Sequence, residues 1–420
     1  MVWLFARGSA ARARKVRCLL AIFLLGPWAV AWASESPAPI HIYLDADRTH
    51  NQASAIAIER GLQVALDEAD NQVQGRPVAL VTTDHRGNSL RAKRNMEQAF
   101  NDPSTLLVMA GMHSPPLIKY RDYINEQQML TLVPWAAGGP ITRYSKGENW
   151  IFRLSVDDTK AGQRLAAYAL TDKHCKHPHL LLERTPWGAS NQKSLTAAFQ
   201  GKLPIEPPTS WFNWEVSEES ARIMLRSIVN SQADCLIFVG NARDGITIMN
   251  AAHSLAQWRT IPVISHWGIT GADFSKRVPH ATREALDLSF LQTCFSFNAP
   301  DLPARAQKVL NLASTRYPGI RSGKDIQAPA GFIHAYDLGR LLLTALNRIS
   351  LGDDMPTNRA ALRRALENLP TPVEGLVKTY QRPFAPFSHK APDAHEALGL
   401  DDLCMARYTA DNSIELLASP

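Results

Sequence analysis

The most constraining feature of this sequence is a regular alternation of short apolar runs with amphipathic helical segments. In the segment 54–70, Ile58, Leu62 and Leu66 recur every fourth residue, which is one face of an α-helix. Strictly alternating strands and helices favour a parallel sheet that is covered by helices on both faces. The first series of predicted strands comprises residues 40–47, 77–84, 105–111 and 129–135.

A second series of the same kind follows a break at Gly138-Gly139-Pro140 and an extended segment at 149–156. We therefore predict an α/β fold of two doubly wound parallel-sheet lobes joined by hinge crossovers. Residues 34–148 and 296–330 are assigned to lobe 1, with helices 331–350 near the hinge. Residues 149–295 form lobe 2, and parts of 351–420 return to the hinge and lobes. Hinge crossings are expected near residues 139–152, 288–295 and 328–331.

Residues 1–33 have the pattern of a signal peptide. A basic stretch precedes an apolar run that ends in Ala31-Trp32-Ala33, an A-x-A cleavage pattern. An uncleaved membrane anchor is the alternative, but Gly26-Pro27 interrupts the short run. We predict export to the periplasm with no membrane insertion after cleavage. Five of the 45 basic residues lie in this segment, which leaves 40 against 39 acids and no basis for nucleic-acid binding.

Four cysteines remain after residue 33, and an exported chain meets an oxidising compartment. Cys175 precedes one predicted strand and Cys235 opens another. Neighbouring parallel strands would bring those two starts together, so we predict the bridges Cys175–Cys235 and Cys294–Cys404. The alternative is four buried free thiols.

Three tryptophans, Trp135, Trp187 and Trp267, each follow the carboxyl end of a predicted strand. In open α/β sheets, ligands bind beyond those ends, so we expect the tryptophans to line a cleft between the lobes. Aromatic faces attract quaternary ammonium and guanidinium cations and stack on planar heterocycles. The alternative is that one or two of them serve as packing between the lobes.

Segments from most of the chain resemble the type I periplasmic substrate-binding proteins, in particular the branched-chain amino-acid (Leu/Ile/Val) receptors that serve ABC transporters. The resemblance implies a periplasmic-binding-protein-like fold that closes on a small molecule by hinge bending. It implies an ABC permease or a sensor as partner and neither catalysis nor a cofactor. Its carriers include ERGLQVALDEADN, GMHSPPL, LVPWAAGGPIT, NWIFRLSVDDTKAGQRLAAY and HAYDLGRLLLTAL.

The resemblance also suggests roles for single residues. Ser114 matches a serine that holds the ligand carboxylate, although a helix-capping serine before two prolines is equally compatible. Trp187 matches a position after the first strand of the second lobe, at which these receptors commonly have an aromatic residue. Ala137 replaces the usual threonine, and Ser54 stands where a bulky aromatic is common, which argues against an α-amino acid ligand. The candidate ligand-binding residues are Asp47, Ser54, Ser114, Trp135, Ala136, Ala137, Trp187, Asn241 and Trp267.

Two other patterns do not support catalysis or metal binding. The run HCKHPH at 174–179 holds four side chains that cannot easily converge on one ion. Ser190 begins an S-x-x-K pattern that lacks its partner motifs. We therefore predict a non-enzymatic solute receptor without metal or cofactor, for a small polar, cationic or heterocyclic solute such as an amino-acid-like compound, amide or amine. A ligand-sensing receptor subunit is the alternative, and an exported hydrolase is a third hypothesis.

Overall fold

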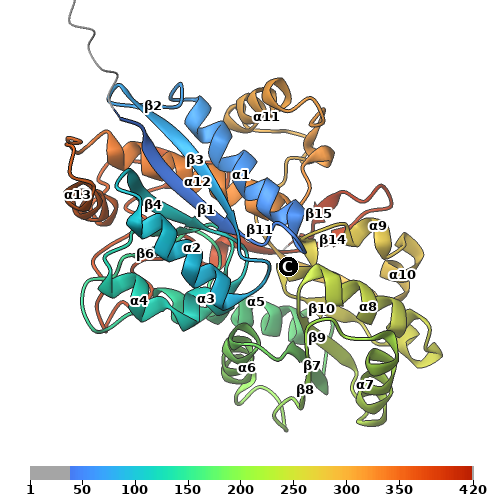
Figure 1. Cartoon of the computed structure of the whole chain (residues 1–420). Coiled ribbons are helices and arrows are strands. Elements are labelled where there is room, and N and C mark those ends of the chain that lie inside the picture. Colours follow the sequence, from blue (N-terminus) through green and yellow to red (C-terminus); the bar gives the residue numbers. More distant parts are fainter. Residues whose placement is uncertain (1–37, 419–420) are drawn as a thin grey trace, which may run out of the picture. The chain divides into compact units, whose positions relative to one another are not determined.

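The computed structural model describes residues 38–418, so the predicted signal peptide lies outside the described residues. Strands and helices alternate along this part of the chain and form two separate, mostly parallel sheets (Figure 1). This confirms the α/β fold with two lobes. None of the helices among residues 38–418 has both the length and the apolar character needed to cross a membrane.

The first sheet contains β1 (Ile40–Ala46), β2 (Gln72–Val73), β3 (Arg76–Asp84), β4 (Thr105–Ala110), β5 (Thr131–Val133) and β6 (Ile151–Arg153). Their order is β2-β3-β1-β4-β5-β6, and all neighbours are parallel except the β2–β3 hairpin at the edge. The central strand β4 is buried along its whole length, because helices cover both faces of the sheet.

The second sheet contains β7 (Pro178–Glu183), β8 (Thr209–Phe212), β9 (Cys235–Val239), β10 (Val263–Ser265), β11 (Ser289–Thr293), β14 (Leu403–Tyr408) and β15 (Ile414–Leu416). The order is β15-β14-β11-β10-β9-β7-β8. Strands β7 to β11 are parallel, whereas β14 pairs antiparallel with β11. Two strands near the end of the chain, β14 and β15, therefore extend this sheet. The pair β12 (Val373–Glu374) and β13 (Thr379–Tyr380) stands apart.

Thirteen α-helices are described among residues 38–418. They are α1 (Gln52–Asp67), α2 (Ser89–Asn101), α3 (Ser114–Lys119), α4 (Arg121–Glu126), α5 (Asp158–Thr171), α6 (Pro186–Phe199), α7 (Glu218–Asn230), α8 (Ala242–His253), α9 (Phe274–Arg277), α10 (His280–Ala285), α11 (Ala304–Arg316), α12 (Pro329–Leu346) and α13 (Met355–Glu367). The glycine Gly61 of α1 lies against α12, and a Cβ there would come within 2.1 Å of the Phe332 carbonyl oxygen. The close approach of the two helices therefore requires glycine at this position.

Both predicted disulfides are present. Cys175 is bonded to Cys235 and Cys294 to Cys404, with Cα–Cα distances of 6.0 and 5.0 Å. The parallel pairing of β7 with β9 places Pro178 opposite Cys235, which is the geometry that suggested the first bridge.

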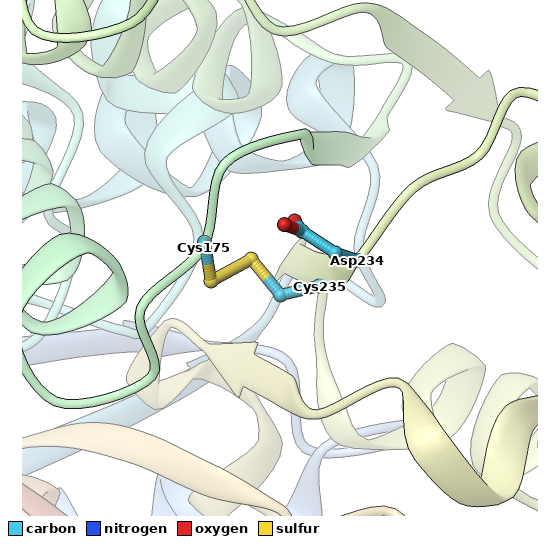
Figure 2. A group of neighbouring side chains, drawn as sticks. All are labelled: Cys175, Asp234 and Cys235. Carbon is cyan, nitrogen blue, oxygen red and sulfur yellow. A yellow bond between two sulfur atoms is a disulfide. The ribbon is translucent and has the colours of Figure 1, made fainter.

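Figure 2 shows Cys175 and Cys235 beside Asp234. Both sulfurs belong to the disulfide, and the Asp234 carboxylate accepts hydrogen bonds from the backbone N–H groups of Lys176 and His177 at 2.6 and 2.9 Å. These three side chains therefore serve to hold the 174–179 loop.

Candidate functional site

The candidate ligand-binding residues follow the carboxyl ends of the parallel strands, except Ser54, which lies in the first turn of α1. Asp47 follows β1, and Ser114 follows β4 as the first residue of α3. Trp135 follows β5, Trp187 follows β7, and Trp267 follows β10. This is the edge at which doubly wound sheets bind ligands.

The three tryptophans, which we call the tryptophan cluster, are all buried, and Trp187 is linked to Trp267 through the His266 ring, whose centroid lies 5.0 Å from that of Trp187 and 5.7 Å from that of Trp267. Trp135, Trp187 and Trp267 are only 2, 5 and 1% exposed. The rings of Trp135 and Trp267 meet edge to face with centroids 6.4 Å apart, so side chains that follow strands of different sheets are in contact. On the other side of Trp135, a Cβ on Gly331 would lie 2.8 Å from the ring. The tryptophan cluster therefore joins the two series of strands through direct packing.

Small residues surround this cluster. The Ser114 hydroxyl accepts a hydrogen bond from the Gly138 N–H at 3.1 Å, and the helix N-cap is the preceding residue His113. Ala136 and Ala137 are buried, and the Ala137 carbonyl accepts the Asp158 N–H at 3.0 Å. Ser54 is fully buried, and its hydroxyl has no hydrogen-bond partner among the described residues.

Asp158, the first residue of α5 and not one of the candidates from sequence, is the polar centre of this region. Its Oδ1 accepts hydrogen bonds from Trp187 Nε1 at 3.0 Å and from Asn191 Nδ2 at 2.9 Å. His266 Nε2 lies 3.5 Å from the same oxygen. Oδ2 accepts the Gly139 N–H at 3.3 Å. One buried carboxylate thus connects the loop after β5 with α6 and with the loop after β10, and only the tertiary contacts reveal this.

A cavity of about 180 Å³ opens between the two series of strands, and we call it the Trp214 cavity. None of Trp135, Trp187 and Trp267 lines it. It lies between the loops after β1, β3 and β4 of the first sheet and the loops after β8 and β9 of the second. Its lining includes Asp47, Asn51 and His113 from the first series and Trp214, Asn241 and Asp244 from the second.

Only Asp47 and Asn241 of this cavity were among the candidates from sequence. Trp214 lies two residues beyond β8, as Trp135 and Trp267 lie two residues beyond β5 and β10, so its place after a strand was a usable signal. Asn51 and His113 carry no such signal, because each is a single polar residue in a loop.

The Asp47 carboxylate is held by three donors. Asn51 Nδ2 donates to Oδ2 at 2.9 Å, His113 Nε2 lies 3.2 Å from the same oxygen, and the His50 N–H donates to Oδ1 at 2.9 Å. Burial alone would raise the pKa of Asp47, but these hydrogen bonds outweigh it and hold the pKa below its ordinary value. Asp47 is therefore an ionised carboxylate in the wall of the cavity.

Behind the cavity, Glu183 at the end of β7 is completely buried. Its Oε1 contacts Thr185 Oγ1 at 2.7 Å, and its Oε2 accepts Asn241 Nδ2 at 3.1 Å. Burial raises the pKa of this carboxyl to about 8, and the hydrogen bonds only partly oppose that effect. Glu183 is therefore a neutral acid at pH 7 that positions Asn241.

Because Glu183 is protonated in the folded state, we expect the stability of the protein to depend on pH. The folded state keeps a proton on Glu183 up to a pKa of about 8, whereas an unfolded glutamate loses it near 4.3. The free energy of unfolding must therefore fall as the pH rises between these values. Relative to a Glu183→Gln variant, wild type should lose about 2 kcal/mol between roughly pH 5.5 and 7.5.

The measurement is urea unfolding of both proteins at several pH values. Glutamine retains an oxygen for Asn241 and a donor for Thr185, so the packing is preserved. The exposed Glu219→Gln is the control, and its difference from wild type should not change with pH. Parallel pH curves for wild type and Glu183→Gln would show that Glu183 is ionised in the folded protein.

The comparisons with known proteins agree with this architecture. The leucine-binding protein LivK of Thermotoga maritima superposes with a TM-score of 0.71 at 15% identity, covering 90% of this chain and 98% of that one. The branched-chain amino-acid binding protein LivJ of Streptococcus pneumoniae, in complex with isoleucine, superposes with a TM-score of 0.70 at 17% identity, covering 90% of this chain and 99% of that one. A solute-binding protein of Rhodopseudomonas palustris, in complex with benzoate, superposes with a TM-score of 0.69 at 16% identity, covering 90% of this chain and 95% of that one.

No curated protein matches the sequence. The model of the periplasmic binding protein family, however, matches residues 43–396, most of the chain. Members of that family are solute-binding proteins rather than enzymes. This chain therefore belongs to the periplasmic binding protein family, as the resemblance of its sequence indicated.

Proposed function

We propose that this protein is an exported receptor that captures a small solute between its two sheets and delivers it to an ABC permease. The observation that carries the proposal is the meeting of the carboxyl ends of both sheets around buried polar groups. Asp158 and the tryptophan cluster connect the two series at this place. A ligand bound there would contact both series and stabilise their closed arrangement.

Specific hydrogen bonds connect the two series close to an expected hinge crossing. The Gly139 N–H donates to Ser190 Oγ at 3.1 Å, and Gly139 lies in one of the three expected hinge crossings. The chain passes from β6 into α5 close to the same point. The A-x-A pattern and two disulfides support a periplasmic location.

The test is a ligand screen on the purified protein by thermal shift, followed by calorimetry. The panel holds branched-chain amino acids, aromatic carboxylates, amides, amidines, amines and sugars. A true ligand at 100 times its Kd adds about 2.7 kcal/mol to the stability of the folded state, which gives a clear shift. A folded protein that binds nothing in the panel, and that shows no co-purified small molecule by native mass spectrometry, would contradict the proposal.

Delivery to a permease is tested separately from binding. A strain that lacks the protein should lose uptake of the radiolabelled ligand and regain it with the wild-type gene. Uptake that is unchanged, together with a lost transcriptional response to the ligand, would assign the protein to sensing.

A further inference from the structure

We propose that the Trp214 cavity binds a small planar cation with several N–H groups, of the amidinium or guanidinium class. This inference rests on the proposed function as a solute receptor and names its site and solute class. The cavity is distinct from the tryptophan cluster, whose members do not line it. At about 180 Å³ it is smaller than the roughly 300–1,000 Å³ of pockets for drug-sized ligands.

A buried acceptor without a partner points to a ligand that donates hydrogen bonds. Asn51 lines the cavity and is 6% exposed. Its Nδ2 lies 2.9 Å from Asp47 Oδ2, and two oxygens would repel there, so this contact sets the orientation of the amide. The Asn51 Oδ1 is then left with no hydrogen-bond partner among the described residues. Such an acceptor is costly unless a ligand donates to it.

An aromatic side chain, Trp214, also lines the cavity. Trp214 comes from the second series, yet its ring is 5.3 Å from the His113 ring of the first series, measured between centroids. A Cβ on Gly87, also in the first series, would lie 3.5 Å from the Trp214 ring. The Trp214 ring therefore lies against residues of the first series. A tryptophan face is the best aromatic partner for a planar cation.

The charges of the cavity favour a cation in its interior. Asp47 and Asp244 line it and are 2 and 4% exposed. The arginines in its lining, Arg86 and Arg243, have side chains 55 and 48% exposed. Arg86 lies 3.5 Å from Asp84, and Arg243 lies 2.8 Å from Glu215, so both positive charges at the rim are already paired.

The helix N-termini at this edge would otherwise attract an anion. Here the protein supplies its own anions to two of them. Asp244 lies in the first turn of α8 and accepts the Val216 N–H at 3.0 Å. Asp47 accepts the His50 N–H just before α1. Asp47 and Asp244 would therefore repel a carboxylate ligand in this cavity, whereas they would attract an amidinium.

Two sets of probes that match in shape and differ in charge test this inference. The first is benzamidinium, benzamide and benzoate, and the second is acetamidinium, acetamide and acetate. Calorimetry on the intact protein should find the amidinium to be the tightest binder in at least one set, at least tenfold tighter than the amide, with no binding of the carboxylate.

Variants locate the binding. Trp214→Leu and Asn51→Leu should each weaken amidinium binding at least fivefold. Trp214 is only half-buried, and leucine at position 51 removes an unpaired polar atom, so both variants should fold. The control is Trp211→Leu, a half-buried tryptophan three residues earlier that does not line the cavity, and it should leave the affinity unchanged.

Each other result overturns the inference in a definite way. Equal binding of amide and amidinium rejects the cationic class. Binding of leucine or benzoate that Trp214→Leu does not affect rejects the site but retains the proposed function. A complete absence of ligands in the wider panel rejects the proposed function itself.

Discussion

Replacing Glu396 with leucine should lower the free energy of unfolding by about 3–5 kcal/mol, because it leaves buried cations without their partner. The side chains of Glu396 and Arg153 are both fully buried. Arg153 Nη2 donates to Glu396 Oε1 at 2.5 Å, and Lys160 Nζ donates to Oε2 at 2.9 Å. Arg143 lies 3.4 Å from the same carboxylate. Without Glu396, the acids that remain near these cations are Asp157 beside the two arginines and Asp393 beside Lys160.

The measurement is equilibrium unfolding in urea. The control is Glu415→Leu, which breaks the exposed pair with Arg407 at 2.8 Å and should cost less than about 1 kcal/mol. Adding Arg153→Met to Glu396→Leu should restore part of the lost stability, since an apolar pair replaces an unpaired charge. Equal small losses for both leucine variants would show that the buried network contributes no more than a surface pair.

Removing the Cys294–Cys404 disulfide should cost about 2–5 kcal/mol. The bridge joins residues 110 apart in sequence, so it strongly restricts the unfolded chain. In the folded state it connects the residue after β11 to β14, where Gln292 pairs with Cys404 and the Cys294 N–H donates to the Asp402 carbonyl at 2.9 Å. The edge of the second sheet thus depends on a covalent link as well as on its hydrogen bonds.

A double Cys294→Ser and Cys404→Ser variant should unfold at lower urea concentration than wild type under oxidising conditions. The double Cys175→Ser and Cys235→Ser variant removes a bridge between residues 60 apart in sequence. Its free energy of unfolding should fall by a similar amount. Adding a reductant should lower the midpoint of wild type and leave a variant without either bridge unchanged. A loss below about 1 kcal/mol for each pair would contradict the stabilising role of the bridges.

Most of the fold could be predicted from the sequence because its signals are local. The alternation of apolar runs with helical periodicity predicts two parallel sheets, since a short βα connection leaves few other arrangements. The pairing of Cys175 with Cys235 followed from their places at the starts of strands. The predicted Cys294–Cys404 bridge placed the segments of β11 and β14 together, but their antiparallel register, Phe290 with Ala406, joins residues more than 100 apart and follows only from the tertiary structure.

The sequence by itself determined which residues follow the carboxyl ends of the strands, because that depends only on where each apolar run stops. It placed Trp135, Trp187 and Trp267 at the carboxyl edge of the predicted sheets. Only the tertiary structure decided that Trp135 packs on Trp267 and Trp187 on His266, whereas Trp214 lines the Trp214 cavity with Asn51 and His113. The physical reason is that burial and pairing are properties of contacts between distant loops, and no local pattern encodes which loops will meet.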